Sequence, residues 1–271
     1  MIQIADIQNA FNRSLNRTFE KNKWLVTFLV LALCGLLVVF SRALGENANV
    51  WMGLSLTFFP IFLCSGLLLA LGVILIRGYH DEITKGDVQY WKILTNSWET
   101  VIGAAYFAIP FLLVYLMLWM LLGIFILLRS IPAVGEFFGV ILSFAPFLLN
   151  FATLLLCVAV IAMLFFVAPI LALKGLNRPL VTELLVRRFQ TDLFSNLLFF
   201  SVALLPLVLY FGLLLASAFL TGSFCVTCEN PIATILEWFF MMIPFAALLA
   251  PALIFFFNFA AEAFVLFQKK R

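Results

Sequence analysis

Long apolar runs separated by polar segments dominate the pattern of this chain. The runs cover residues 24–40, 51–76, 99–128, 136–173, 196–220 and 232–267. About 17 to 25 apolar residues in a helix cross the hydrocarbon core of a bilayer, which is about 30 Å thick. Lipid offers no partners for unpaired backbone groups, and the runs lack the polar–apolar alternation of a membrane β-barrel. The pattern therefore predicts an all-α, polytopic transmembrane helical bundle with six spans.

Polar segments with an amphipathic stripe precede the first, third and fifth runs. The apolar residues of the stripes recur four positions apart: Phe11, Leu15 and Phe19; Tyr90, Leu94 and Trp98; Leu185, Phe189 and Leu193. This spacing predicts three helices along the membrane surface. It also suggests three repeat units, 1–78, 79–175 and 176–271, each with a surface helix, an outward span and a returning span. The alternative is that apolar-rich helices share such spacing by coincidence.

Two of the runs are too long for a straight crossing. As continuous helices, residues 136–173 and 232–267 would each exceed about 50 Å at about 1.5 Å per residue. We expect their outer stretches to form an apolar cap, with kinks at Pro146 and Pro244.

Composition and charge indicate the solvent and the orientation. Hydrophobic residues make up 65% of the chain and charged residues 11%, far from the balance of a soluble domain. Of the 16 Lys and Arg residues, only Arg42 and Arg129 fall in the loops on one side; the others flank the opposite ends of the spans. Positive residues mark the cytoplasmic side, so both termini are predicted to be cytoplasmic. We expect membrane lipid as a partner, other membrane proteins as further candidates, and no nucleic acid.

Polar residues inside the last run are candidates for a ligand or proton site. Asn258 and Glu262 lie four residues apart, on one face of the predicted helix. An acid in hydrocarbon costs a few kcal/mol and tends to face the interior of a bundle. The alternative is that Glu262 reaches the inner interface or pairs with Lys269 or Lys270.

Cys225 and Cys228 lie in the predicted outer loop between the fifth and sixth spans. An oxidising compartment would let them form a disulfide, although idle thiols and a redox pair are alternatives. The other cysteines fall within spans, so a zinc site of four thiolates is not expected.

The single histidine stands next to acids just past the second run, in Arg77-Gly78-Tyr79-His80-Asp81-Glu82. A solvated helix end explains this cluster, and a metal or acid–base role is the alternative. No phosphate-binding loop, catalytic triad or zinc-protease motif occurs, so neither a cofactor nor a metal is predicted.

The cytoplasmic link between the fourth and fifth spans reads Pro169-Ile170, Lys174-Gly175, Pro179-Leu180 and Arg187-Arg188-Phe189. With its six spans and three amphipathic segments, the chain resembles a broad group of bacterial inner-membrane proteins. This group includes the membrane domain fused to some glycerophosphodiester phosphodiesterases. The resemblance implies a bacterial cytoplasmic membrane and brings no catalytic motif to transfer.

Two classes of function fit the sequence. The favoured one is a non-enzymatic carrier for a lipid-like or small solute, or a membrane assembly partner, because polar groups in the spans are scarce. The alternative is a membrane enzyme acting on lipid head groups at the cytoplasmic face, with His80, Asp81, Glu82 and Asp87 as its candidate residues.

Overall fold

The computed structural model describes residues 4–45, 50–86, 90–96, 98–131, 135, 140, 144–175, 178–191, 193–221 and 231–269. Its helices are α1 (Ile4–Asn16), α2 (Lys21–Gly45), α3 (Val50–Lys85), α4 (Tyr90–Asn96), α5 (Trp98–Ala105), η1 (Tyr106–Ala108), α6 (Ile109–Arg129), α8 (Ala145–Lys174), α9 (Arg178–Thr191), α10 (Leu193–Leu220) and α11 (Pro231–Lys269). The predicted all-α bundle is confirmed for this part of the chain.

Six helical segments among the described residues are long and apolar enough to cross a membrane. They are α2, most of α3, the continuous segment Trp98–Arg129, α8, α10 and most of α11. The third segment joins α5, η1 and α6, and its 3₁₀ turn lies just before Pro110. A proline ring clashes with the carbonyl four residues earlier, which explains the local tightening.

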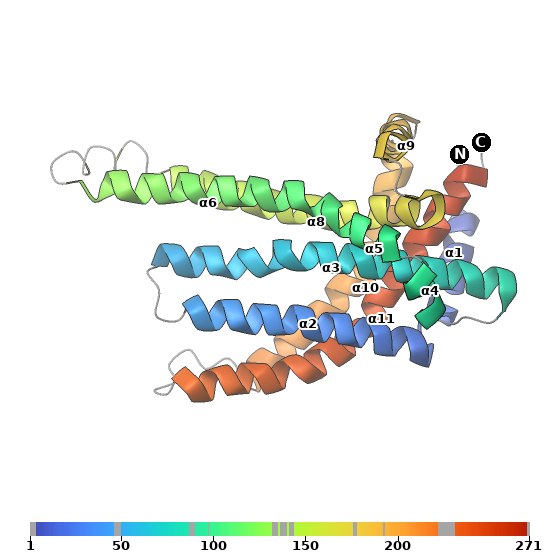
Figure 1. Cartoon of the computed structure of the whole chain (residues 1–271), viewed down its shortest axis with the longest axis horizontal. Coiled ribbons are helices and arrows are strands. Elements are labelled where there is room, and N and C mark those ends of the chain that lie inside the picture. The colour runs from blue at the N-terminus through green and yellow to red at the C-terminus, as the bar shows by residue number, and fades with distance from the viewer. Residues whose placement is uncertain are drawn as a thin grey trace.

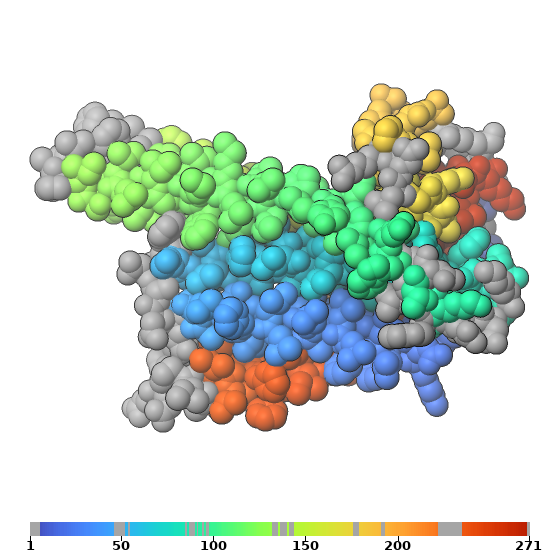
Figure 2. All heavy atoms as spheres, in the orientation of Figure 1, coloured from blue at the N-terminus to red at the C-terminus, as the bar shows by residue number. Residues whose placement is uncertain are grey.

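The spans run side by side, and the N- and C-termini lie at the same end of the bundle (Figure 1). We call this end the termini end and the other the distal end. Helices α3 and α8 form the centre, since 61% and 56% of their apolar windows are buried, against 11% for Trp98–Arg129. Figure 2 shows α6 extending beyond the distal ends of α2 and α3.

Phenylalanine side chains fill the core near the termini end. Phe165 of α8 contacts Phe200 of α10 and Phe256 of α11, with ring centroids 5.6 and 5.7 Å apart. Gly72 of α3 lies so close to Phe257 that a Cβ atom there would stand 2.4 Å from the ring. Close helix packing at glycine therefore lets α3 and α11 approach each other.

The three predicted helices form, but the first residue of each predicted stripe packs on the core and the last does not. Tyr90 is buried and Phe11 and Leu185 are half-buried, whereas the last residues of the stripes, Phe19, Trp98 and Leu193, are exposed. Helix α1 ends before Phe19, which is 71% exposed, and it buries Ala10 and Ser14 instead. Phe11 packs on α11, with its ring 5.0 Å from that of Phe255. The second stripe is divided between α4 and α5 and the third between α9 and α10. Docking on neighbouring helices, rather than a free membrane surface, selects these faces.

The two apolar runs that are too long for a straight crossing, residues 136–173 and 232–267, form different structures. Helix α8 begins at Ala145 with Pro146 in its first turn, so this proline starts a helix instead of kinking one. Residues 136–139 and 141–143 lie outside the described part. Helix α11 stays helical through Pro244 and Pro251, so residues 232–247 form no separate cap. Figure 1 shows α11 changing direction along its course.

Candidate functional site

Glu262 is held at the termini end by residues from two other helices. The Tyr79 hydroxyl of α3 donates a hydrogen bond of 2.6 Å to Glu262 Oε1, and Arg13 Nη1 of α1 lies 3.5 Å from the same oxygen. Glu262 is 6% exposed, so these donors replace water around a buried carboxylate. Among the described residues its cationic partner is Arg13 rather than Lys269, and Lys270 lies outside them.

A second ionic cluster surrounds Lys23 of α2, whose side chain is fully buried. Its ammonium group bonds to Glu82 of α3, lies 3.2 Å from Glu20 Oε2 and donates to the Arg17 carbonyl at 3.2 Å. Arg17 Nη1 contacts Glu82 Oε1 at 2.6 Å. Lys23 Nζ also stands 5.5 Å from the centroid of the Tyr79 ring. Tyr79 thus contacts both clusters.

Tyr90 of α4, a helix outside the spans, contacts the second cluster through Glu20. Its hydroxyl donates to Glu20 Oε2 at 3.4 Å, and the residue is 8% exposed. Burial first, then the negative charges of Glu20 and Glu82, raise the pKa of Tyr90. The phenol therefore stays neutral and keeps its proton to donate.

Asn258 lies one helical turn deeper in the span than Glu262 and is fully buried. Neither its Oδ1 nor its Nδ2 finds a hydrogen-bond partner within the described part of the chain. Thr27, also fully buried, lies one turn deeper in α2 than Lys23, and its Oγ1 is unpartnered there too. The ionic clusters are thus followed, toward the membrane interior, by polar groups with unused donors and acceptors.

The alternative catalytic residues do not come together in the described residues. His80 is exposed, whereas Glu82 is engaged by Lys23 and Arg17. Asp87 lies outside the described part. No group of three or more His, Cys, Asp or Glu side chains that could hold a metal occurs in that part.

The predicted disulfide between Cys225 and Cys228 also lies outside the described residues and stays a prediction. Two buried cysteines meet elsewhere: Cys64 Sγ of α3 lies 3.7 Å from the Cys34 carbonyl oxygen of α2.

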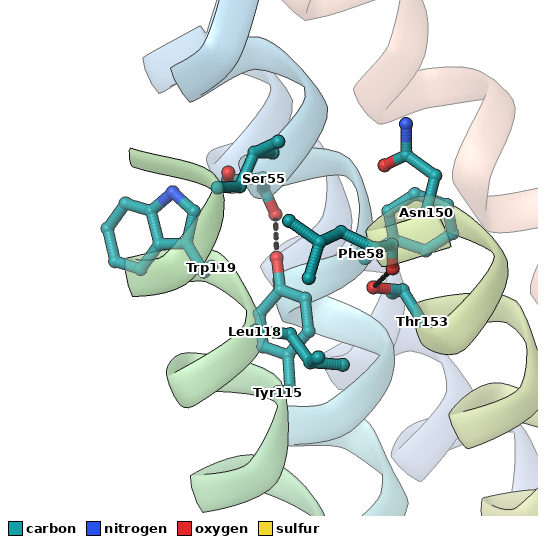
Figure 3. A pocket seen from close by; sticks show the side chains of 9 residues that line it. Ser55, Phe58, Tyr115, Leu118, Trp119, Asn150 and Thr153 are labelled. Atoms are coloured by element: carbon teal, nitrogen blue, oxygen red, sulfur yellow. Dashed lines mark hydrogen bonds between the residues drawn. The ribbon is translucent and has the colours of Figure 1, made fainter. Parts of the chain in front are cut away.

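A small pocket opens between α3, α6 and α8 toward the distal end (Figure 3). Tyr115 donates a hydrogen bond to the Ser55 carbonyl at its wall, and Asn150 and Thr153 line the other side. Its volume of ≈ 20 Å³ holds about one water molecule. This pocket is too small for a solute.

Sequence reasoning proposed Asn258 and Glu262 as a site, with Arg13 on a nearby surface helix, but it did not foresee the contacts of Tyr79 and Lys23. Lys23 stands at the start of an apolar run, where a topology signal is the ordinary explanation for a lysine. Comparison of the chain with protein-family models, curated proteins and solved structures finds no match.

Proposed function

We propose that this chain is a non-enzymatic membrane protein that binds a lipid-like or small polar solute at Asn258 and Glu262. The observation that carries this proposal is the fully buried Asn258 amide, which has no hydrogen-bond partner on either side-chain atom among the described residues. An unsatisfied buried polar group costs about 1–3 kcal/mol. A ligand with both a donor and an acceptor recovers that energy.

The surroundings of Asn258 suit a small polar group. Thr27 of α2, a helix that packs against α11, supplies a second buried hydroxyl without a partner in the described part of the chain. Both contacts of Glu262 within the described part of the chain go to Oε1, which leaves Oε2 to accept a hydrogen bond from the ligand. The Arg13 side chain is 58% exposed while it contacts Glu262, so its movement provides a route from the termini end.

The orientation of the protein in the membrane determines from which side a ligand reaches this site. We place the protein in a bacterial cytoplasmic membrane with both termini in the cytoplasm, because Lys and Arg residues concentrate on the loops of that side. The ligand then enters from the cytoplasmic leaflet or the cytoplasm. Fixed protein–protein assembly is the alternative within the same class, and the identity of the material that co-purifies in mild detergent separates the two.

The enzyme alternative rests on His80, which is exposed near the end of α3. Its test is His80→Ala. An unchanged cellular phenotype with unchanged stability removes the enzyme case, whereas a folded variant without function favours it.

Substitution of Glu262 tests the proposed binding. We expect Glu262→Gln to fold, because an amide oxygen still accepts from Tyr79, and to lose the ligand that wild type retains through purification. Glu237→Gln is the matched control, since Glu237 lies in α11 but is exposed near the distal end. A folded Glu262→Leu protein with full ligand content and activity would overturn the proposal.

A further inference from the structure

A second buried polar cluster, separate from Asn258, surrounds Arg188 of α9. Arg188 is 8% exposed, and its Nε donates to Asn196 Oδ1 at 2.8 Å. The Asn196 amide donates back to the Arg188 carbonyl at 2.7 Å, and Asn196 is itself fully buried in the first turn of α10. These two hydrogen bonds fix the guanidinium beside the N-terminus of α10.

Aromatic rings from two other helices hold the guanidinium group. Its central carbon lies 4.9 Å from the ring centroid of Phe166 in α8 and 4.8 Å from that of Phe267 in α11. Such contacts attract a cation but accept no conventional hydrogen bond. Nη1 and Nη2 are buried without a hydrogen-bond partner in the described part of the chain.

No carboxylate in the described part of the chain forms an ion pair with the Arg188 guanidinium. Glu183 lies 3.1 Å from Arg187 Nη2, and Glu262 is engaged by Tyr79 and Arg13. Burial lowers the pKa of Arg188 to about 10, so the group remains protonated at neutral pH. Asp192, four residues away in sequence, lies outside the described part and enters the test below.

The first turn of α10 adds a second attraction for an anion. Backbone N–H groups in the first turn of a helix lack intrahelical acceptors, and the helix dipole favours negative charge there. The same turn presents Leu193 and Phe194 to the surroundings, with exposures of 62% and 77%, as a lipid-facing surface does.

We propose that Arg188, Asn196 and the first turn of α10 form a binding site for a phosphate group. A planar guanidinium with two terminal nitrogens is the preferred donor for such an oxyanion. The group comes from a lipid head group or from free phosphate. Because both nitrogens are covered by neighbouring side chains, binding requires the flanking rings to shift.

The test measures thermal unfolding of the full chain in maltoside detergent micelles, which contain no phosphate group, with phosphatidylglycerol or inorganic phosphate titrated in. We expect wild type to be stabilised in a saturable manner. Arg188→Gln should weaken the apparent affinity roughly 10- to 100-fold, the effect of losing a charge-assisted hydrogen bond. Arg187→Gln is the matched control, because the neighbouring side chain is 57% exposed and should leave the titration unchanged.

Comparing the two additions, phosphatidylglycerol and inorganic phosphate, identifies the source of the phosphate group. Stabilisation by phosphatidylglycerol alone assigns a lipid, and stabilisation by inorganic phosphate assigns a free anion. Titrations that match between wild type and Arg188→Gln, or no response to either addition, overturn the proposal. If Arg188→Gln does not fold, Arg188→Lys replaces it, with Arg187→Lys as control; equal affinities then overturn it.

Asp192→Asn separates an internal partner from an external anion. If Asp192 neutralises Arg188, the variant is less stable than wild type and wild type does not respond to either addition, which contradicts the proposal. If the anion is external, Asp192→Asn binds the phosphate at least as tightly as wild type, because a negative charge four residues from Arg188 in the sequence is gone.

Discussion

Tyr79 and Glu262 join the second and last spans through a hydrogen bond of 2.6 Å between the phenol and the carboxylate. The same phenol ring lies 5.5 Å from the buried ammonium group of Lys23. The Tyr79 side chain therefore contacts both Glu262 of the proposed ligand site and the ionic cluster around Lys23. Loss of the hydrogen bond should weaken the packing of α11 on α3.

Tyr79→Phe removes the donor and leaves the ring in place. We expect a loss of about 1.5–3 kcal/mol in the free energy of unfolding, as for other hydrogen bonds to charged groups. Denaturant unfolding in detergent measures it. Tyr210→Phe, at a tyrosine that is 42% exposed in α10, should change nothing. Equal stabilities of wild type and Tyr79→Phe would show that the bond contributes no net stability.

Lys23→Met removes the cation at the centre of the second cluster. Glu82 would keep Arg17 as a partner, and Glu20 would lose its contact with Lys23. Removing one partner of a buried ion pair costs about 3–5 kcal/mol. Lys21→Met is the control, because Lys21 is exposed two residues earlier in the same helix. The same unfolding assay applies, and comparable stabilities for the two variants would contradict a structural role for Lys23.

Alkaline pH should destabilise the protein through Tyr90. Its pKa in the folded chain is raised, so the unfolded chain releases this proton first. Stability from this group is complete below the ordinary tyrosine pKa of about 10 and is lost as pH rises above it. Between about pH 8 and about pH 11, a range that spans this pKa, the unfolding temperature should fall less in Tyr90→Phe than in wild type. Identical slopes would exclude this contribution; Tyr106→Phe, at an exposed tyrosine, is the control.

Single-cysteine probes test the orientation of the bundle. Cysteines at Asn47 and Glu229 should react with an impermeant reagent added to intact cells, because their loops contain few or no bases. Cysteines at Lys85 and Arg187 should react only after the membrane is opened. Labelling of the Lys85 position from outside would reverse the assigned topology.

The length of the apolar runs made the helical membrane fold predictable, because lipid leaves few alternatives for a backbone. The end of α3 was not predictable in the same way. Residues 77–85 contain Arg77 and Glu82 and have the composition of a loop, yet they continue the helix. Glu82 is neutralised by Lys23, 59 residues away in sequence, and local patterns contain no trace of that pairing.

Arg188 illustrates the same limit at the candidate sites. In the sequence it is one of two adjacent bases in the link between the fourth and fifth spans, and the side chains of such a link are ordinarily solvated. In the structure Arg187 is exposed while Arg188 is enclosed by Phe166 and Phe267. A one-residue step around a helix decides between solvent and core, and only the packing of α9 determines which residue faces inward.

Native mass spectrometry of Asn258→Leu shows whether the Asn258 amide holds a ligand in the purified protein. Leucine matches asparagine closely in size and removes an amide that has no partner in the described structure. We predict that wild type and Asn150→Leu, whose substituted amide lines the small distal pocket, carry the same non-covalent mass, and that Asn258→Leu folds without it. An Asn258→Leu protein that retains that mass, or a wild type purified in mild detergent that carries none, would contradict the account.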